Sequence, residues 1–147
     1  MPAYVHVRVH LIWSTKYREP RISPEWQDEL YRYLYGICEN LNCKLLVAGG
    51  VTDHLHTYVG IPATLSIADL VNAMKSNSSR WIHEKFDPAF AWQTKYAAFS
   101  VSKSVEDQLF AYIRNQQEHH RHRSFRDELV EFLERHEMEW DERYLLE

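Results

Sequence analysis

His54-Leu55-His56-Thr57-Tyr58-Val59-Gly60-Ile61 is the stretch that decides the fold, because it is a mostly apolar run that opens with two histidines one residue apart. In a β-strand the side chains alternate between the two faces of the sheet, so His54 and His56 point to the same side. Pro62 ends the run, since proline cannot donate a hydrogen bond to a sheet ladder. A strand here therefore fixes two imidazoles side by side on a rigid element, as half of a metal site requires.

A second alternating run lies near the start of the chain, in residues 4–13. It reads Tyr-Val-His-Val-Arg-Val-His-Leu-Ile-Trp, with valine, leucine and tryptophan on one face. The other face carries His6, Arg8 and His10, together with Ile12. This pattern predicts a strand with one face buried in a core and one polar face.

Local signals predict the elements between these runs. Ser23-Pro24 indicates the start of a helix that reaches about Asn40, because serine caps helices and proline suits their first position. Residues 44–47 predict a short apolar strand, and Gly49-Gly50 is a turn signal.

Serines followed by an aspartate three residues later predict the remaining helices. The three pairs are Ser66 with Asp69, Ser104 with Asp107, and Ser124 with Asp127. The first helix is expected to end near His83. Residues 87–95 are expected to form an irregular loop, and residues 97–101 a fourth strand.

The resulting order, β-α-β-β-α-β followed by two helices, predicts an α+β fold of the ferredoxin-like type. Such a fold is an antiparallel sheet with helices on one face, and its first and third strands are central neighbours. His6, Arg8 and His10 would then lie beside His54 and His56. Residues 1–147 are expected to form one domain, with a catalytic core at about 4–120 and an acidic C-terminal helix and tail at about 124–147.

The composition indicates a folded protein without a membrane partner. Hydrophobic residues make up 45% and aromatic residues 14% of the 147 residues. No apolar run approaches the roughly 20 residues of a membrane span, and the start of the chain has no signal-peptide layout. Cys38 and Cys43 form neither a framework nor a CxxC pair, which predicts reduced thiols and a cytoplasmic location.

The net charge of −4 is concentrated at one end of the chain. Residues 125–147 hold nine acidic and three basic residues, a net charge of −6. The other 124 residues hold 14 basic and 12 acidic residues, a net charge of +2. This mildly basic body is compatible with a polyanionic partner without requiring one.

Tyr112 and Gln116 are four residues apart in the predicted helix that follows Ser104, so they share one face, which His120 continues. Each motif alone has an ordinary explanation: a buried histidine pair in the strand, and a packed tyrosine with a surface amide on the helix. Together they suggest a phosphoryl-transfer site. His54, His56 and Gln116 would hold one divalent cation, and Tyr112 would attack phosphorus to form a covalent phosphotyrosine.

Five segments carry a resemblance to a known family. They are His10-Leu11-Ile12-Trp13-Ser14-Thr15-Lys16-Tyr17-Arg18, Gly49-Gly50-Val51-Thr52-Asp53-His54-Leu55-His56, Lys75-Ser76-Asn77-Ser78-Ser79-Arg80-Trp81-Ile82, Ala98-Phe99-Ser100-Val101-Ser102 and Tyr112-Ile113-Arg114-Asn115-Gln116-Gln117-Glu118-His119-His120. They resemble the single-tyrosine HUH transposases of bacterial insertion sequences, the IS-two-hundred-like group, with its palindrome-associated domesticated relatives. The resemblance covers roughly residues 4–130.

The resemblance implies a homodimer that cuts and rejoins single-stranded DNA at element ends marked by hairpins. It implies magnesium or manganese as the cofactor and a 5′-phosphotyrosine intermediate. Tyr112 would be the nucleophile, with His54, His56 and Gln116 as metal ligands. The tyrosine helix of one subunit often serves the histidine pair of the other in this family, so the resemblance leaves assembly in cis and in trans both open.

One segment departs from the family pattern. Lys95 and Ala97 stand where the family has glycines, so the local loop and any DNA contact it makes are expected to differ.

Basic side chains are candidates for phosphate contacts, although such residues are more often a solvated surface. The candidates are Lys16, Arg18, Lys75, Arg80, Arg114 and Arg121. Two other functions remain open beside an active transposase. One is a domesticated protein that binds palindromic repeats without mobilising them. The other is a ferredoxin-like RNA-binding or metal-storage module in which the histidines are structural.

Overall fold

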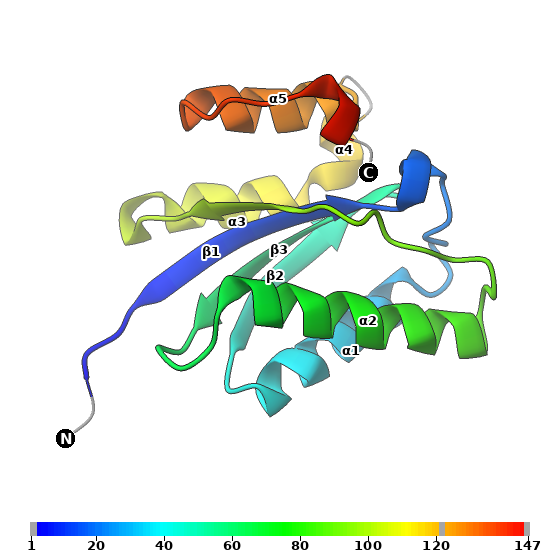
Figure 1. Cartoon of the computed structure of the whole chain (residues 1–147), viewed down its shortest axis with the longest axis horizontal. Coiled ribbons are helices and arrows are strands. Elements are labelled where there is room, and N and C mark those ends of the chain that lie inside the picture. Colours follow the sequence, from blue (N-terminus) through cyan, green and yellow to red (C-terminus); the bar gives the residue numbers. More distant parts are fainter. Residues whose placement is uncertain (1–2, 121–122, 146–147) are drawn as a thin grey trace.

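The fold is built on a four-stranded antiparallel sheet in the order β2-β3-β1-β4 (Figure 1). The computed structural model describes residues 3–120 and 123–145. The strands are β1 (Val7–Ser14), β2 (Lys44–Gly50), β3 (His54–Ile61) and β4 (Ala97–Ser100). The helices are α1 (Gln27–Asn40), α2 (Ile67–Lys85), α3 (Glu106–Arg114), α4 (Gln116–His119) and α5 (Phe125–Arg135). The α+β class and the predicted order up to the fourth strand are confirmed. Three helices rather than two follow β4, because the predicted helix that carries Tyr112 and Gln116 is divided into α3 and α4.

The two central strands are β1 and β3, as the ferredoxin-like plan predicts. Their antiparallel register pairs Ile12 with His56 and Ser14 with His54. The histidine strand is therefore supported by hydrogen bonds on both edges, since β2 pairs with its other side and sets Gly49 opposite His56.

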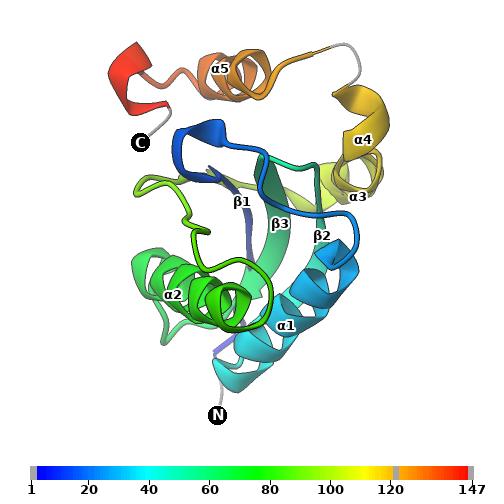
Figure 2. The same ribbon diagram turned by 90° about the vertical axis from the view of Figure 1, so that its right-hand side faces the viewer.

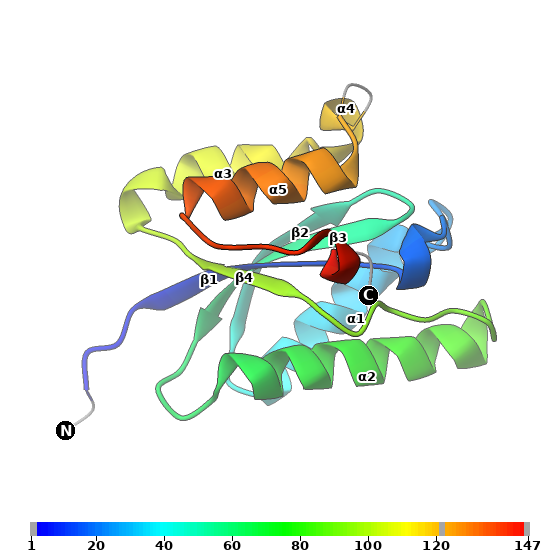
Figure 3. The same cartoon turned by 45° about the horizontal axis from the view of Figure 1, so that its top comes forward.

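Helices cover both faces of this sheet, which corrects the expectation of helices on one face (Figure 2). On one face α1 and α2 pack over the apolar side of β1, where Leu11 and Trp13 are fully buried. On the other face lie α3 and α5 (Figure 3). His10 and Ile12 on the other face of β1 are buried as well, beneath α5, whereas Arg8 is only half-buried and pairs with Glu106 of α3.

A second, smaller hydrophobic core joins α5 to the sheet. Its buried members are Ile12, Phe99, Phe125, Leu129, Val130, Leu133 and Leu145. Alternation in residues 4–13 predicted a polar face, but it could not reveal that a distant amphipathic helix encloses that face. The residues of the histidine pair lie between this smaller core and α3.

Two of the three predicted serine caps are confirmed. The Oγ atoms of Ser66 and Ser124 accept hydrogen bonds from the backbone N–H groups of Asp69 and Asp127, each at 3.1 Å. The third predicted cap, Ser104 with Asp107, is wrong. Ser102 precedes a 3₁₀ turn at Lys103–Val105, and α3 begins only at Glu106.

Other boundaries also differ from the predictions. The first strand begins at Val7 rather than at residue 4, and α1 begins at Gln27, several residues after Ser23-Pro24. Gly49 and Gly50 do not form a turn but end β2. A Cβ atom at Gly49 would lie 2.2 Å from the backbone oxygen of Ile113, so glycine here allows α3 to approach the sheet.

Both cysteines are free and buried, as reduced thiols should be. Burial raises the pKa of the Cys38 thiol to about 12, so it is inert at neutral pH. Lys95 and Ala97 both have negative φ, so neither position requires glycine. Among the described residues, none of the helices has the length and apolar character needed to traverse a membrane.

Candidate metal centre and tyrosine

His54 and His56 project from β3 toward the face covered by α3 and α5, and neither side chain is exposed. Each ring is held through its Nδ1 atom. Nδ1 of His54 lies 2.8 Å from a carboxylate oxygen of Asp53, and Nδ1 of His56 lies 2.8 Å from Nε2 of His10. Hydrogen bonds of this kind orient the histidines of metal sites, and they leave both Nε2 atoms directed at one point.

Tyr112 and Gln116 reach the same place, although not on one continuous helix as predicted. The helix α3, which carries Tyr112, ends at Arg114, and Gln116 is the first residue of the short helix α4. The Gln116 side chain is nevertheless buried, and its Oε1 lies 3.0 Å from Nε2 of His54. The ring of Tyr112 meets that of His56 edge-on, with the ring centroids 5.7 Å apart. The structure thus brings together all four residues singled out from the sequence.

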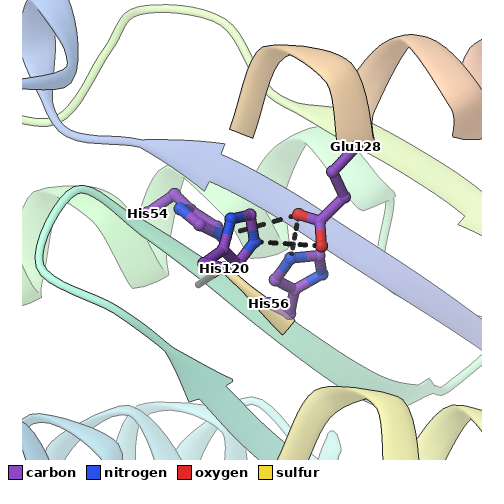
Figure 4. A group of neighbouring side chains, drawn as sticks. All are labelled: His54, His56, His120 and Glu128. Atoms are coloured by element: carbon purple, nitrogen blue, oxygen red, sulfur yellow. Dashed lines mark hydrogen bonds and ion pairs between the residues drawn. The ribbon is translucent and has the colours of Figure 1, made fainter. Parts of the chain in front are cut away.

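Glu128 of α5 is the central residue of the cluster, and the sequence analysis missed it (Figure 4). Its carboxylate is 1% exposed, with Oε1 lying 2.8 Å from Nε2 of His56 and 3.5 Å from Nε2 of His54. The other oxygen lies 3.1 Å from Nε2 of His120, and the Tyr112 hydroxyl also donates to it. One signal was available: Glu128 falls on the apolar stripe of its helix, between Phe125 and Phe132.

Burial and charge shift the protonation of these groups in opposite directions. Burial alone would lower the pKa of His54, but the Asp53 and Glu128 carboxylates outweigh it and raise the pKa to about 9. Burial dominates at His56 and lowers its pKa to about 4. Burial and the Glu128 carboxylate raise the pKa of Tyr112 above its ordinary value of 10.

The donor set fits a divalent metal ion. One ligand atom from each of His54, His56, His120 and Glu128 lies within 4.8 Å of every other. Imidazole nitrogens combined with carboxylate oxygens suit several divalent metals, manganese among them. The cluster can therefore hold one cation, with the oxygen of Gln116 next to it.

The basic candidates are distributed over both sides of the molecule. Arg18 and Arg123 line one cleft together with His120, next to the cluster. Arg114 is exposed and lines a separate cleft beside Gly49. Lys16 is exposed in the turn that follows β1.

Two further basic candidates lie far from the cluster. Lys75 and Arg80 belong to α2, which covers the opposite face of the sheet. The Lys75 amine donates to the backbone oxygen of Lys95 at 3.0 Å, and burial lowers its pKa to about 8. Arg121 falls outside the described residues. Of the five candidates that the structure describes, Arg18 is thus the one that lines the cleft next to the cluster.

An antiparallel four-stranded sheet with a buried His-x-His pair on a central strand places this protein in the HUH-like class of α+β proteins. A family model described as "Transposase IS200 like" matches residues 3–116. The chain therefore belongs to the IS200-like transposase family, whose members are DNA-binding enzymes of transposition.

Relatives support the same assignment. The ISDra2 transposase TnpA of Deinococcus radiodurans is 28% identical over 121 residues, covering 77% of this chain and 86% of the relative. The transposase for insertion sequence element IS200 of Salmonella typhimurium is 26% identical over 118 residues, covering 76% and 77%.

Two solved structures share the fold. The crystal structure of a candidate transposase from D. radiodurans has a TM-score of 0.65 at 29% identity, covering 79% of this chain and 95% of the other. A REP-associated tyrosine transposase bound to a REP hairpin has a TM-score of 0.59 at 10% identity, covering 77% and 68%. At that identity the second likeness concerns the fold alone.

Proposed function

We propose that this transposase cuts and rejoins single-stranded DNA at hairpin-marked element ends through a 5′-phosphotyrosine. Tyr112 is the nucleophile, and His54, His56 and Gln116 hold a Mg²⁺ or Mn²⁺ ion. The observation that carries the proposal is the position of Tyr112, whose ring contacts His56 while its hydroxyl reaches into the cluster. A nucleophile and a cation site are thereby next to each other.

The chemistry follows from this arrangement. A cation held by the histidine pair would neutralise charge that develops on the phosphodiester oxygens. The Tyr112 oxygen forms a bond to phosphorus while the bond from phosphorus to the 3′ oxygen breaks. The phenol loses its proton and the departing 3′ oxygen gains one, so the number of protons is conserved. The phosphotyrosine retains the energy of the broken bond for rejoining.

The surface near the cluster suits a DNA strand. Arg18 and Arg123 line the cleft beside His120, where they can neutralise phosphates. A second cleft lies between α3 and α5 and is lined by both Tyr112 and Glu128. In this proposal the enzyme acts as a homodimer in the cytoplasm.

A covalent-adduct assay tests the proposal. Single-stranded oligonucleotides that tile the DNA on both sides of the gene are labelled at the 3′ end and incubated with the protein and Mn²⁺. A 5′-phosphotyrosine retains the 3′ label, so a labelled protein band is expected on a denaturing gel. The same strands labelled at the 5′ end should release a shorter, protein-free fragment.

Two tyrosine variants make the assay specific. Tyr112→Phe should abolish the adduct. Tyr58→Phe is the matched control, because Tyr58 lies on the same face of β3 but its hydroxyl donates to Glu106 at 2.7 Å, away from the cluster. Equal adduct yields from wild type and Tyr112→Phe would exclude Tyr112 as the nucleophile. Hairpin binding without any adduct would instead indicate a domesticated DNA-binding protein.

A further inference from the structure

We infer that the C-terminal helix α5 is part of the metal centre: Glu128 is a ligand of the cation, and cation binding fixes α5 over the histidine pair. The inference rests on the proposed function for the position of the cation at His54 and His56. It adds a charged oxygen ligand that neither histidine nor glutamine can supply.

The geometry of the carboxylate carries this inference. Oε1 of Glu128 lies within 3.5 Å of the Nε2 atoms of both His54 and His56, which are the atoms that would bind the metal. Oε2 is 3.3 Å from the side-chain nitrogen of Gln116, so the amide of the third proposed ligand borders the same carboxylate. A cation that binds both histidines must therefore lie next to Glu128.

The cost of burying the Glu128 carboxylate also favours a cation beside it. An ionised carboxylate at 1% exposure is costly unless charge or hydrogen bonds compensate it. Without metal, Nε2–H groups of the surrounding imidazoles provide much of that compensation. A cation can replace those protons, since metal binding to histidine releases them. The buried carboxylate is thus suited to a site that holds a cation, whose positive charge would compensate it.

The position of Glu128 is set by packing as well as by charge. Phe125, one turn earlier, packs against the ring of His54 in a tilted arrangement, with the ring centroids 4.5 Å apart. Leu129 and Leu133 anchor the helix in the smaller core. These contacts hold α5 over the histidine pair, and a cation bound by Glu128 would strengthen that attachment.

Glu128 lies in the C-terminal part of the chain, outside the region that the family model matches. The matched region ends at Gln116, whereas α5 begins at Phe125. The histidine pair and Gln116 thus belong to the matched core, and Glu128 comes from outside it. His54, His56, Gln116 and Glu128 would together hold the cation, which would supply positive charge to a bound phosphodiester.

Manganese binding tests the assignment. The free Mn²⁺ signal in electron paramagnetic resonance is titrated with metal-free wild type, Glu128→Gln, Glu134→Gln and His56→Ala. Glu134 is the matched control, because it lies in the same helix and is exposed. We expect Glu128→Gln to lose about tenfold or more in affinity, comparable to losses seen when groups supporting a metal site are removed. Glu134→Gln should match wild type.

The pattern separates two kinds of failure. If His56→Ala binds Mn²⁺ as well as wild type, the cation is not at the histidine pair and the proposed function fails with it. If His56→Ala loses affinity but Glu128→Gln does not, the histidine pair stands and only the role of Glu128 is overturned. If Glu128→Gln binds Mn²⁺ as tightly as wild type and also cleaves DNA faster, Glu128 is not a ligand. The carboxylate would then occupy the place of a DNA phosphate in the wild type.

Hydrogen exchange on the wild type guards against misfolding of the variant. Mg²⁺ should slow amide exchange in α5 (Phe125–Arg135) severalfold more than in α1 (Gln27–Asn40), which lies on the other face of the sheet. Equal effects in the two helices would contradict a ligand on α5. In Glu128→Gln the extra protection of α5 should disappear.

Discussion

The Nε2 atom of His10 lies 2.8 Å from the Nδ1 atom of His56. His10 itself is buried, and its ring meets that of Phe132 edge-on, with the ring centroids 5.1 Å apart. This contact fixes the orientation of His56 and leaves the other ring nitrogen directed at Glu128. A histidine of β1 therefore supports the candidate metal centre on β3 without entering it.

His10→Ala should weaken cation binding because His56 loses the partner that orients it. Removing such a partner typically costs about 10- to 100-fold in metal affinity. Calorimetric titration with Mn²⁺ measures the effect, and Tyr58→Phe, on the same face of the neighbouring strand, should bind as wild type does. Wild-type affinity in His10→Ala would show that the smaller core alone holds His56 in place.

Gly49→Ala should destabilise the protein and lower adduct formation together. Its Cβ would overlap the backbone oxygen of Ile113, so α3, which also carries Tyr112, must move away from the sheet. Such overpacking costs about 1–3 kcal/mol in the free energy of unfolding, measurable by urea denaturation. Gly36→Ala is the control. A Cβ there meets nothing within 4 Å, and the change should stabilise α1 by about 0.5–1 kcal/mol.

Thr57→Val should stabilise the protein. The Thr57 hydroxyl is buried on β3 and has no hydrogen-bond partner among the described residues. An unsatisfied buried hydroxyl costs about 1–3 kcal/mol, and valine has nearly the same shape. The free energy of unfolding should therefore rise by about 1 kcal/mol.

The same substitution elsewhere should have the opposite effect. Thr15 is also buried, but its hydroxyl donates to the backbone oxygen of Glu19 at 2.6 Å. Thr15→Val removes that bond and should lower the free energy of unfolding by about 1 kcal/mol. If both variants shift stability in the same direction, hydrogen bonding of the hydroxyl does not determine the outcome.

The sequence predicted the parts of this fold that depend on local pattern. Alternation placed His54, His56 and His10 on strands, and the serine caps at Ser66 and Ser124 follow from residues three apart. Their physical causes, side-chain periodicity and a cap hydrogen bond, are both contained in a few residues.

The parts that the sequence could not predict depend on contacts between distant segments. Gly49-Gly50 has the local signature of a turn, yet the approach of α3 places glycine at the end of a strand. The acidic composition of residues 125–147 concealed Glu128 among eight other acids. Only the packing of α5 against the sheet distinguishes the one that is buried beside the histidines.

Tyr112 lies beside the histidine pair of its own chain, which predicts an active site assembled in cis. The ring centroids of Tyr112 and His56 are 5.7 Å apart, and Gln116 contacts His54 within the same chain. Wild type and His56→Ala, carrying tags of different size, are therefore coexpressed and tested for adducts. Assembly in cis should put the labelled DNA on the wild-type chain alone, because His56→Ala keeps its tyrosine but lacks a complete pair. Labelled DNA on the His56→Ala chain would instead show that Tyr112 attacks at the histidines of a second subunit.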